Sequence, residues 1–191
     1  MKWIGKRISF VEDKNKTTII IYPEDVSWVK AVMGAWVGMW IAIGATITWS
    51  YFNLDLTEQE NIILIVFMAF WLYFAVKVFR SFFWLLWGKE LIKIDEVSLS
   101  YKKSIKGYGK AGVYLLDNIT KIKEVDIQEN SIQSIWEKSP WVKGGERIEF
   151  EYKGKLVQFG RKILPKDSKL LLRLISKRVE EKVRKLNKSN Q

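Results

Sequence analysis

The sequence predicts a membrane protein of mixed class, in which two transmembrane helices precede a mainly β domain that ends in a helix. Three observations lead to this prediction. Two long apolar runs lie between Val29 and Trp87, short β-prone segments follow from Lys89, and an amphipathic pattern begins at Pro165. A helix needs about 20 apolar residues to cross the hydrocarbon core of a bilayer, so both runs are long enough.

The two apolar runs are interrupted by few charges. The first, Val29–Phe52, contains only Lys30, at its edge. The second begins at Asn61 and contains Lys77 and Arg80, whose long side chains can place their charges at the headgroup level. The alternative is a buried hairpin in a soluble domain, but a soluble core helix of this length normally shows a polar face. We therefore expect both runs to cross the membrane.

The charges beside the apolar runs predict the topology. The connector, residues 53–60, contains Asp55, Glu58 and Glu60 and no Lys or Arg, whereas both outer flanks contain lysines. Because positively charged loops stay in the cytoplasm, we expect the connector outside and both termini in the cytoplasm. The expected location is the cell (inner) membrane, with the first helix as an uncleaved insertion signal.

The chain divides into four expected parts. Residues 1–28 form a cytoplasmic β-hairpin segment, 29–87 the transmembrane hairpin, 88–187 a cytoplasmic domain and 188–191 a tail. Residues from 88 onward hold 24 of the 32 Lys and Arg and 14 of the 21 Asp and Glu, a net charge of +10. This excess suits an anionic partner, and beside a membrane anchor we favour anionic lipid over nucleic acid.

Residues 88–187, the expected cytoplasmic domain, are predicted to form about seven strands and one helix. The strands are expected at residues 91–95, 97–105, 110–116, 119–127, 131–136, 147–152 and 155–159. A proline in the first turn and an apolar stripe predict a helix from Pro165 to Leu186. The run from Gly107 to Gly112 matches the letters of a dinucleotide-binding fingerprint, but β-prone residues follow it, so it predicts a turn.

Several short motifs along the chain are informative in combination. They are Gly88-Lys-Glu90, Ile92-Lys-Ile-Asp95 with Leu99, Tyr114-Leu-Leu-Asp117-Asn-Ile119, and Phe150-Glu-Tyr152-Lys-Gly154-Lys-Leu-Val-Gln-Phe159-Gly160, with Tyr22-Pro23 and Trp28 before the hairpin. Together they resemble the small bacterial membrane proteins that carry a pleckstrin-homology-like (PH-like) domain behind a two-helix hairpin. The resemblance implies a β-barrel capped by the C-terminal helix. It implies no catalytic residues, because that family is mostly without assigned activity.

Two groups of residues are candidate sites. Six basic residues are candidates for contact with anionic headgroups: Lys102, Lys103, Lys106, Lys110, Arg161 and Lys162. Alternatively, these six residues only form a solvent-exposed, solubilising surface. In the first helix, Gly34, Gly38 and Ala42 are spaced by four, which allows another helix to approach closely. The expected neighbour is the chain's own second helix, and the alternative is a homo-oligomer seam.

The sequence favours a protein that is not an enzyme. It contains no Cys and no His, which excludes thiolate and imidazole chemistry, and no cofactor is expected. We expect a basic module that binds anionic lipid or a membrane-protein partner. The alternatives are an accessory or assembly subunit of a larger membrane complex and a small transporter or membrane enzyme. Nucleic acid is not expected as a partner, since no recognition signature is present.

Overall fold

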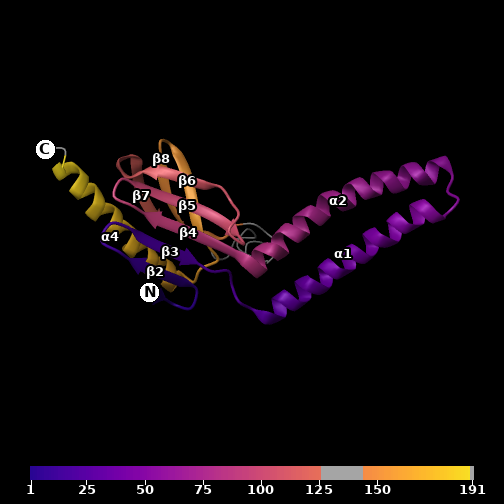
Figure 1. The fold of residues 1–191 in the computed structure, drawn as a ribbon, viewed down its shortest axis with the longest axis horizontal. Coiled ribbons are helices and arrows are strands. Elements are labelled where there is room, and N and C mark those ends of the chain that lie inside the picture. The colour runs from indigo at the N-terminus through magenta and orange to yellow at the C-terminus, as the bar shows by residue number, and fades with distance from the viewer. Residues whose placement is uncertain (126–143, 190–191) are drawn as a thin grey trace. The chain divides into compact units, whose positions relative to one another are not determined.

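The structure, a computed structural model, describes residues 1–125 and 144–189. The chain forms two units: a β unit, Met1–Glu24 with Trp87–Gln191, and a helical unit, Asp25–Leu86. The helical unit is inserted between the third and fourth strands of the β unit (Figure 1). The expected strand at 131–136 lies outside the described residues.

Two long helices make up the helical unit and end where the β unit resumes. They are α1 (Ser27–Asn53) and α2 (Glu58–Trp87), and both are long and apolar enough to cross a membrane. The N-terminus of α2 is capped, because the backbone N–H and the hydroxyl of Thr57 each donate to Glu60 Oε2 at 2.9 Å. This capping box explains why the helix begins directly after the acidic connector.

A seam of small and aromatic residues holds α1 against α2. The buried residues of α1, Met33, Val37 and Gly44, lie on one face of the helix. Across the seam, the indole Nε1–H of Trp71 donates to the carbonyl of Trp40 at 3.1 Å, and the two rings lie 6.3 Å apart. Residues that recur at intervals of three and four form such a contact stripe between antiparallel helices.

The candidate packing residues of α1 differ in their surroundings. A Cβ at Gly34 would lie 3.6 Å from a phenylalanine ring of α2, which is ordinary van der Waals contact. A Cβ at Gly38 would meet nothing within 4 Å, and Ala42 is exposed. The closest approach is at Gly44, where a Cβ would overlap the ring of Trp71. The four-residue spacing does not include Gly44, and it was therefore missed.

Gly44→Ala is expected to lower the melting temperature of the full-length protein. The added methyl group overlaps the Trp71 ring, and overpacking of this kind costs about 1–3 kcal/mol. Gly38→Ala is the matched control, because it adds the same group where nothing lies within 4 Å. Thermal unfolding followed by circular dichroism measures both. Equal melting temperatures for the two variants would contradict this account of the seam.

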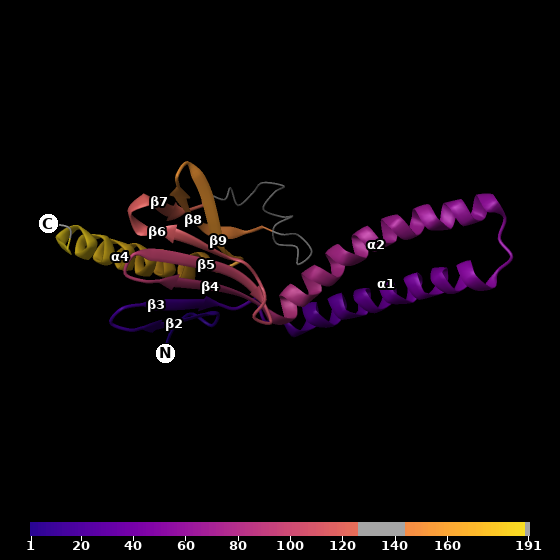
Figure 2. The same ribbon diagram turned by 45° about the horizontal axis from the view of Figure 1, so that its top comes forward.

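The described part of the β unit contains two antiparallel sheets (Figure 2). The six-stranded sheet has the order β1 (Lys2–Ile4), β2 (Ile8–Glu12), β3 (Thr17–Ile21), β4 (Gly88–Ile94), β5 (Ser98–Ile105) and β6 (Ala111–Leu115). The three-stranded sheet has the order β7 (Ile119–Glu124), β8 (Glu146–Tyr152) and β9 (Lys155–Arg161). A 3-10 turn, η1 (Leu116–Asn118), links them.

The sheets correct one part of the predicted fold. A mainly β region with a C-terminal helix is confirmed, but in the described residues the two sheets do not close into a barrel. The N-terminal strands also belong to the six-stranded sheet, since β3 pairs with β4 from Ile21↔Glu90 to Thr17↔Ile94. Residues 1–28 were expected to form a separate segment, because sequence patterns do not show strand pairing across a long insertion.

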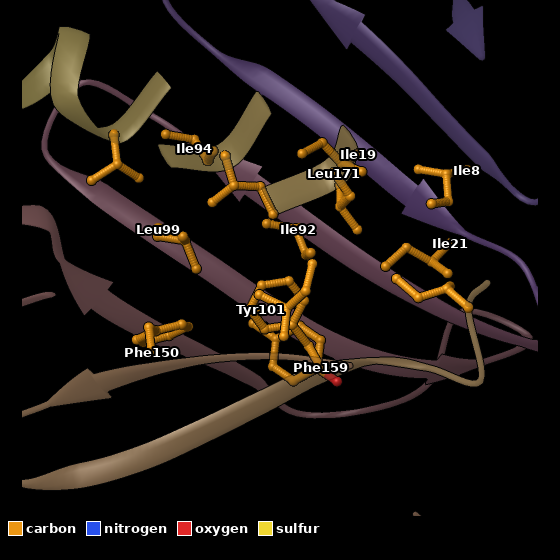
Figure 3. Close-up of a cluster of buried hydrophobic side chains, with 14 of the residues drawn as sticks. Ile8, Ile19, Ile21, Ile92, Ile94, Leu99, Tyr101, Phe150, Phe159 and Leu171 are labelled. Carbon is orange, nitrogen blue, oxygen red and sulfur yellow. The ribbon is translucent and has the colours of Figure 1, made fainter. Parts of the chain in front are cut away.

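The helix α4 (Pro165–Ser189) and both sheets enclose one hydrophobic core (Figure 3). The expected stripe of α4 faces this core, with Leu171, Ile175 and Val179 buried. The other buried members are Ile8, Ile19, Ile21, Ile92, Ile94, Leu99, Tyr101, Leu116, Ile148, Phe150, Phe159 and Ile163. Because β2 and β3 supply three of these isoleucines, the N-terminal strands are part of the core.

An ion pair between β2 and α4 predicts that the β unit loses stability in acid. Glu12 accepts hydrogen bonds from Arg178 and Lys2, and these bonds, Arg178 first, lower the pKa of the Glu12 carboxyl below its ordinary value of 4.5. A carboxyl with a lowered folded-state pKa stabilises the fold above its unfolded pKa, and this stabilisation is lost as pH falls through the folded-state value.

We therefore expect the melting temperature to fall below about pH 4.5 and Glu12→Gln to reduce that fall. A pH series of thermal unfolding from pH 7 to pH 3 measures the effect for both proteins. The same acid dependence in Glu12→Gln as in the natural chain would show that this pair does not contribute.

Candidate functional site

One end of the six-stranded sheet carries both connections to the helical unit. β3 ends at Ile21, which pairs with Glu90 near the start of β4, so the chain leaves and re-enters the sheet at the same end. Gly88 pairs with Ile105, which places the β5–β6 turn at this end as well. We term it the helix-bearing end.

A buried carboxylate ties the two sheets together at the helix-bearing end. Glu90 is only 2% exposed. Its Oε2 accepts hydrogen bonds from the hydroxyl of Tyr101 at 3.0 Å and the backbone N–H of Gly160 at 2.8 Å, and its Oε1 accepts the backbone N–H of Arg161 at 3.0 Å. Burial and the neighbouring Glu90 charge raise the pKa of Tyr101, so its hydroxyl stays protonated as a donor. Three donors offset the desolvation of the carboxylate.

Arg7 clamps the N-terminal strands onto the same end. Its guanidinium donates to the carbonyls of Tyr22 at 3.0 Å and Arg161 at 3.2 Å, and also to that of Lys162. Burial lowers the pKa of Arg7, while nearby carboxylates, including Glu90, oppose this. An arginine pKa remains far above neutral even so, and the group stays charged. The contacts made by Arg7 and Glu90 all join protein elements, so we interpret this network as structural.

Basic and aromatic side chains surround the network at the protein surface. The Nζ of Lys89 lies 5.2 Å from the centre of the Tyr22 ring, which stacks against Trp3 at 5.9 Å. Trp3 is 54% exposed and Tyr108, in the β5–β6 turn, is 85% exposed. We define the cationic rim as the exposed residues Trp3, Lys6, Lys89, Lys106, Tyr108 and Lys110.

The β5–β6 turn holds one of these lysines in an unusual conformation. Lys106 has φ 49° and Gly107 has φ 91°, the pattern of a hairpin turn with two left-handed residues. A residue other than glycine adopts this conformation at a penalty of about 1 kcal/mol. The Nζ of Lys106 lies 3.7 Å from the centre of the Trp87 ring, at the last residue of α2. This cation–π contact offsets part of the strain.

Two of the predicted headgroup lysines are used inside the β unit. Lys102 donates to the carbonyl of Gly107 at 2.7 Å, which fixes the β5–β6 turn. Lys103 forms an ion pair with Glu146 at 2.8 Å, between the two sheets. This pairing lowers the pKa of the Glu146 carboxyl even though burial, the largest single influence, acts to raise it. Both lysines therefore already have an acceptor or a counter-charge inside the β unit.

The other four predicted headgroup residues differ in their exposure and in their contacts. Arg161 and Lys162 are partly buried, and their backbone carbonyls accept from Arg7. Lys106 is exposed but lies over the indole ring at the end of α2. Lys110 is exposed and forms no hydrogen bond or ion pair within the described part of the chain.

Four rim residues were not among the predicted headgroup contacts: Tyr108, in the β5–β6 turn, and Trp3, Lys6 and Lys89. Trp3, Lys6 and Lys89 reach the helix-bearing end because β1, β2 and β3 join the sheet there. Their signals in the sequence were weak, because Lys89 lies directly outside the second apolar run, whereas Trp3 and Lys6 lie in the N-terminal segment. Ammonium groups next to exposed indole and phenol rings are a combination suited to phosphates at a membrane–water interface.

Comparisons with protein-family models, with curated proteins and with solved structures find no match to this chain. Its function is therefore argued from the residues and the geometry. The PH-like resemblance stays a prediction.

Proposed function

We propose that this is a non-enzymatic membrane protein whose two helices cross the bilayer and hold a basic, PH-like β unit at the membrane surface, where the cationic rim contacts anionic lipid headgroups. One observation carries the proposal: the rim lies at the end of the sheet from which both connections to the long apolar helices leave.

The exposure of the two helices supports the membrane part of the proposal. Only 17% of the most apolar window of α1 and 6% of that of α2 are buried within the structure. A core helix of a soluble protein would be mostly buried, and an apolar surface of this extent needs a bilayer or another protein to cover it.

The strand pairing restricts the topology. β3 precedes α1 and β4 follows α2, and the two strands are neighbours in one sheet. Residues 21 and 88 therefore lie on the same side of any membrane that the helices cross. Two crossings meet this condition, and the lysines that flank the hairpin favour the cytoplasm as that side.

Chain connectivity supports contact between the rim and headgroups. Lys89 follows the last residue of α2 by two positions, so its Cα lies within about 7 Å of the helix end. A tether of this length keeps the other rim lysines at the surface, where each contributes about 1 kcal/mol to binding an acidic leaflet. The two sheets followed by one amphipathic helix support the PH-like assignment of the unit.

A single-cysteine experiment tests the rim, because the natural chain contains no cysteine. Tyr108→Cys, at the rim, and Asn15→Cys, in the β2–β3 turn at the opposite end of the sheet, carry the same fluorophore in full-length protein reconstituted into vesicles. We expect 30% phosphatidylglycerol, added to phosphatidylcholine, to protect the label at position 108 from an aqueous quencher. The label at position 15 should stay accessible, and high salt should remove the protection.

A variant of the cationic rim shows whether its lysines cause this protection. Lys6→Gln/Lys89→Gln/Lys110→Gln should abolish the effect of phosphatidylglycerol at position 108 while leaving the melting temperature unchanged. Equal quenching at positions 108 and 15 in both lipid mixtures would overturn the proposed headgroup contact.

A second candidate function, an accessory subunit of a membrane complex, is favoured by one face of α1. Gly38 has open space beside it and Ala42 is exposed, so another helix can approach there. Under this proposal a membrane protein should copurify in fixed ratio, and Gly38→Leu should release it. A monomer without a partner in mild detergent would count against it.

A further inference from the structure

A continuous column of exposed side chains runs along the face of α2 that points away from α1. The column recurs at intervals of three and four residues and therefore occupies one face of the helix. Its members are Ile63, Val66, Phe70, Tyr73, Lys77 and Arg80. The first four are 66%, 50%, 64% and 55% exposed. The column is therefore apolar towards the connector and cationic towards the β unit.

The cationic end of the column has no counter-charge among the residues that the structure describes. Lys77 Nζ lies 4.2 Å from the centre of the Tyr73 ring and donates to its hydroxyl. Across residues 1–125 and 144–189, neither Lys77 nor Arg80 forms an ion pair, and Asp25, an acidic residue of the helical unit, is paired with Lys30. A cation near hydrocarbon without an anionic partner is unfavourable, so one is expected from outside.

Helix geometry places the two cations at the edge of the hydrocarbon layer. The polar first turn of α2 ends at Asn61, and about 20 residues are needed to cross about 30 Å of hydrocarbon. Counting from Ile62 brings the far boundary to about Ser81. Arg80 then lies at the level of the lipid phosphates, and Lys77 lies about 5 Å deeper, within reach of them.

We propose that this face of α2 is a binding site for one phospholipid. Arg80 and Lys77 hold the phosphodiester, the hydroxyl of Tyr73 adds a hydrogen bond, and an acyl chain lies along Phe70 and Val66. A guanidinium suits a phosphate because it can donate two parallel hydrogen bonds. The polarity of the column matches the orientation of a lipid in the leaflet next to the β unit. A carboxylate on a partner helix would pair with Lys77 and Arg80, but it would not explain the apolar part of the column.

The inference rests on the membrane-spanning part of the proposed function but not on the rim. Two net positive charges favour an anionic lipid, so the probe is phosphatidylglycerol, titrated onto full-length protein in mild detergent and counted by native mass spectrometry. Lys77→Gln/Arg80→Gln is expected to bind it about tenfold more weakly. Lys77→Arg/Arg80→Lys should keep the affinity, which shows that charge rather than folding is responsible.

Two controls separate this site from other basic surfaces. Lys14→Gln/Lys16→Gln removes the same charge from the β2–β3 turn, and Lys89→Gln/Lys110→Gln removes it from the rim. Both should leave the tightly bound lipid in place. Equal affinity of Lys77→Gln/Arg80→Gln and the natural chain would overturn the site. Loss of the lipid in the rim variant alone would also overturn it and would assign the binding to the rim.

Discussion

Residues 88–191 expressed alone are expected to stay unfolded, whereas a chain in which a four-residue Gly-Ser linker replaces residues 25–86 is expected to fold as a soluble protein. The fragment lacks β3, the neighbour of β4, and three core isoleucines, Ile8, Ile19 and Ile21, which are at most 2% exposed. Removal of each buried isoleucine side chain costs about 2–5 kcal/mol, so the total exceeds the stability of most domains.

The linker succeeds because of strand geometry. Ile21 and Glu90 are paired in adjacent antiparallel strands, so Tyr22 and Lys89 follow as neighbours and a short turn can join them. Size-exclusion chromatography, circular dichroism and the dispersion of amide NMR signals measure the outcome for both proteins. A fragment 88–191 that folds cooperatively, or a linker protein that does not, would contradict the inserted-hairpin architecture.

Glu90→Leu is expected to destabilise the linker protein by about 3–5 kcal/mol, the second largest effect. The substitution leaves the Tyr101 hydroxyl and the backbone N–H groups of Gly160 and Arg161 without their acceptor in a buried site. Denaturant unfolding gives the free energy directly, and the full-length protein in detergent gives the matching change in melting temperature.

Two controls define the role of Glu90. Tyr101→Phe removes one donor and leaves the other two bonds intact, so a loss of only about 1 kcal/mol is expected. Glu96→Gln changes an exposed carboxyl in the β4–β5 turn and should have almost no effect. A loss for Glu90→Leu as small as that for Tyr101→Phe would show that the carboxylate does not join the sheets.

Local patterns predicted the elements well because each element has a strong periodic signal. The stripe that includes Leu171, Ile175 and Val179 identified α4, and two apolar runs identified α1 and α2. Contacts between distant segments were less predictable. The pairing of Ile21 with Glu90 leaves no local trace, so the joining of β1, β2 and β3 to the main sheet was missed and a closed barrel was expected instead.

The candidate site shows the same limit. The basic loop around Lys106 and Lys110 was located from sequence, since clustered lysines beside a glycine turn are a local signal. Whether a lysine is free depends on its partners in space: Lys103 pairs with Glu146, which is far along the chain. Gly44 was missed for a similar reason, because its significance comes from a ring on the other helix.

The central claim is that two membrane crossings hold the β unit on one side of the bilayer. Single cysteines at Asn15, Asp55 and Glu96, introduced into the cysteine-free chain, test it with a membrane-impermeant maleimide in intact cells and in inverted vesicles. The account predicts that positions 15 and 96 react only in inverted vesicles and position 55 only in intact cells. Labelling of all three positions from the same side would contradict it.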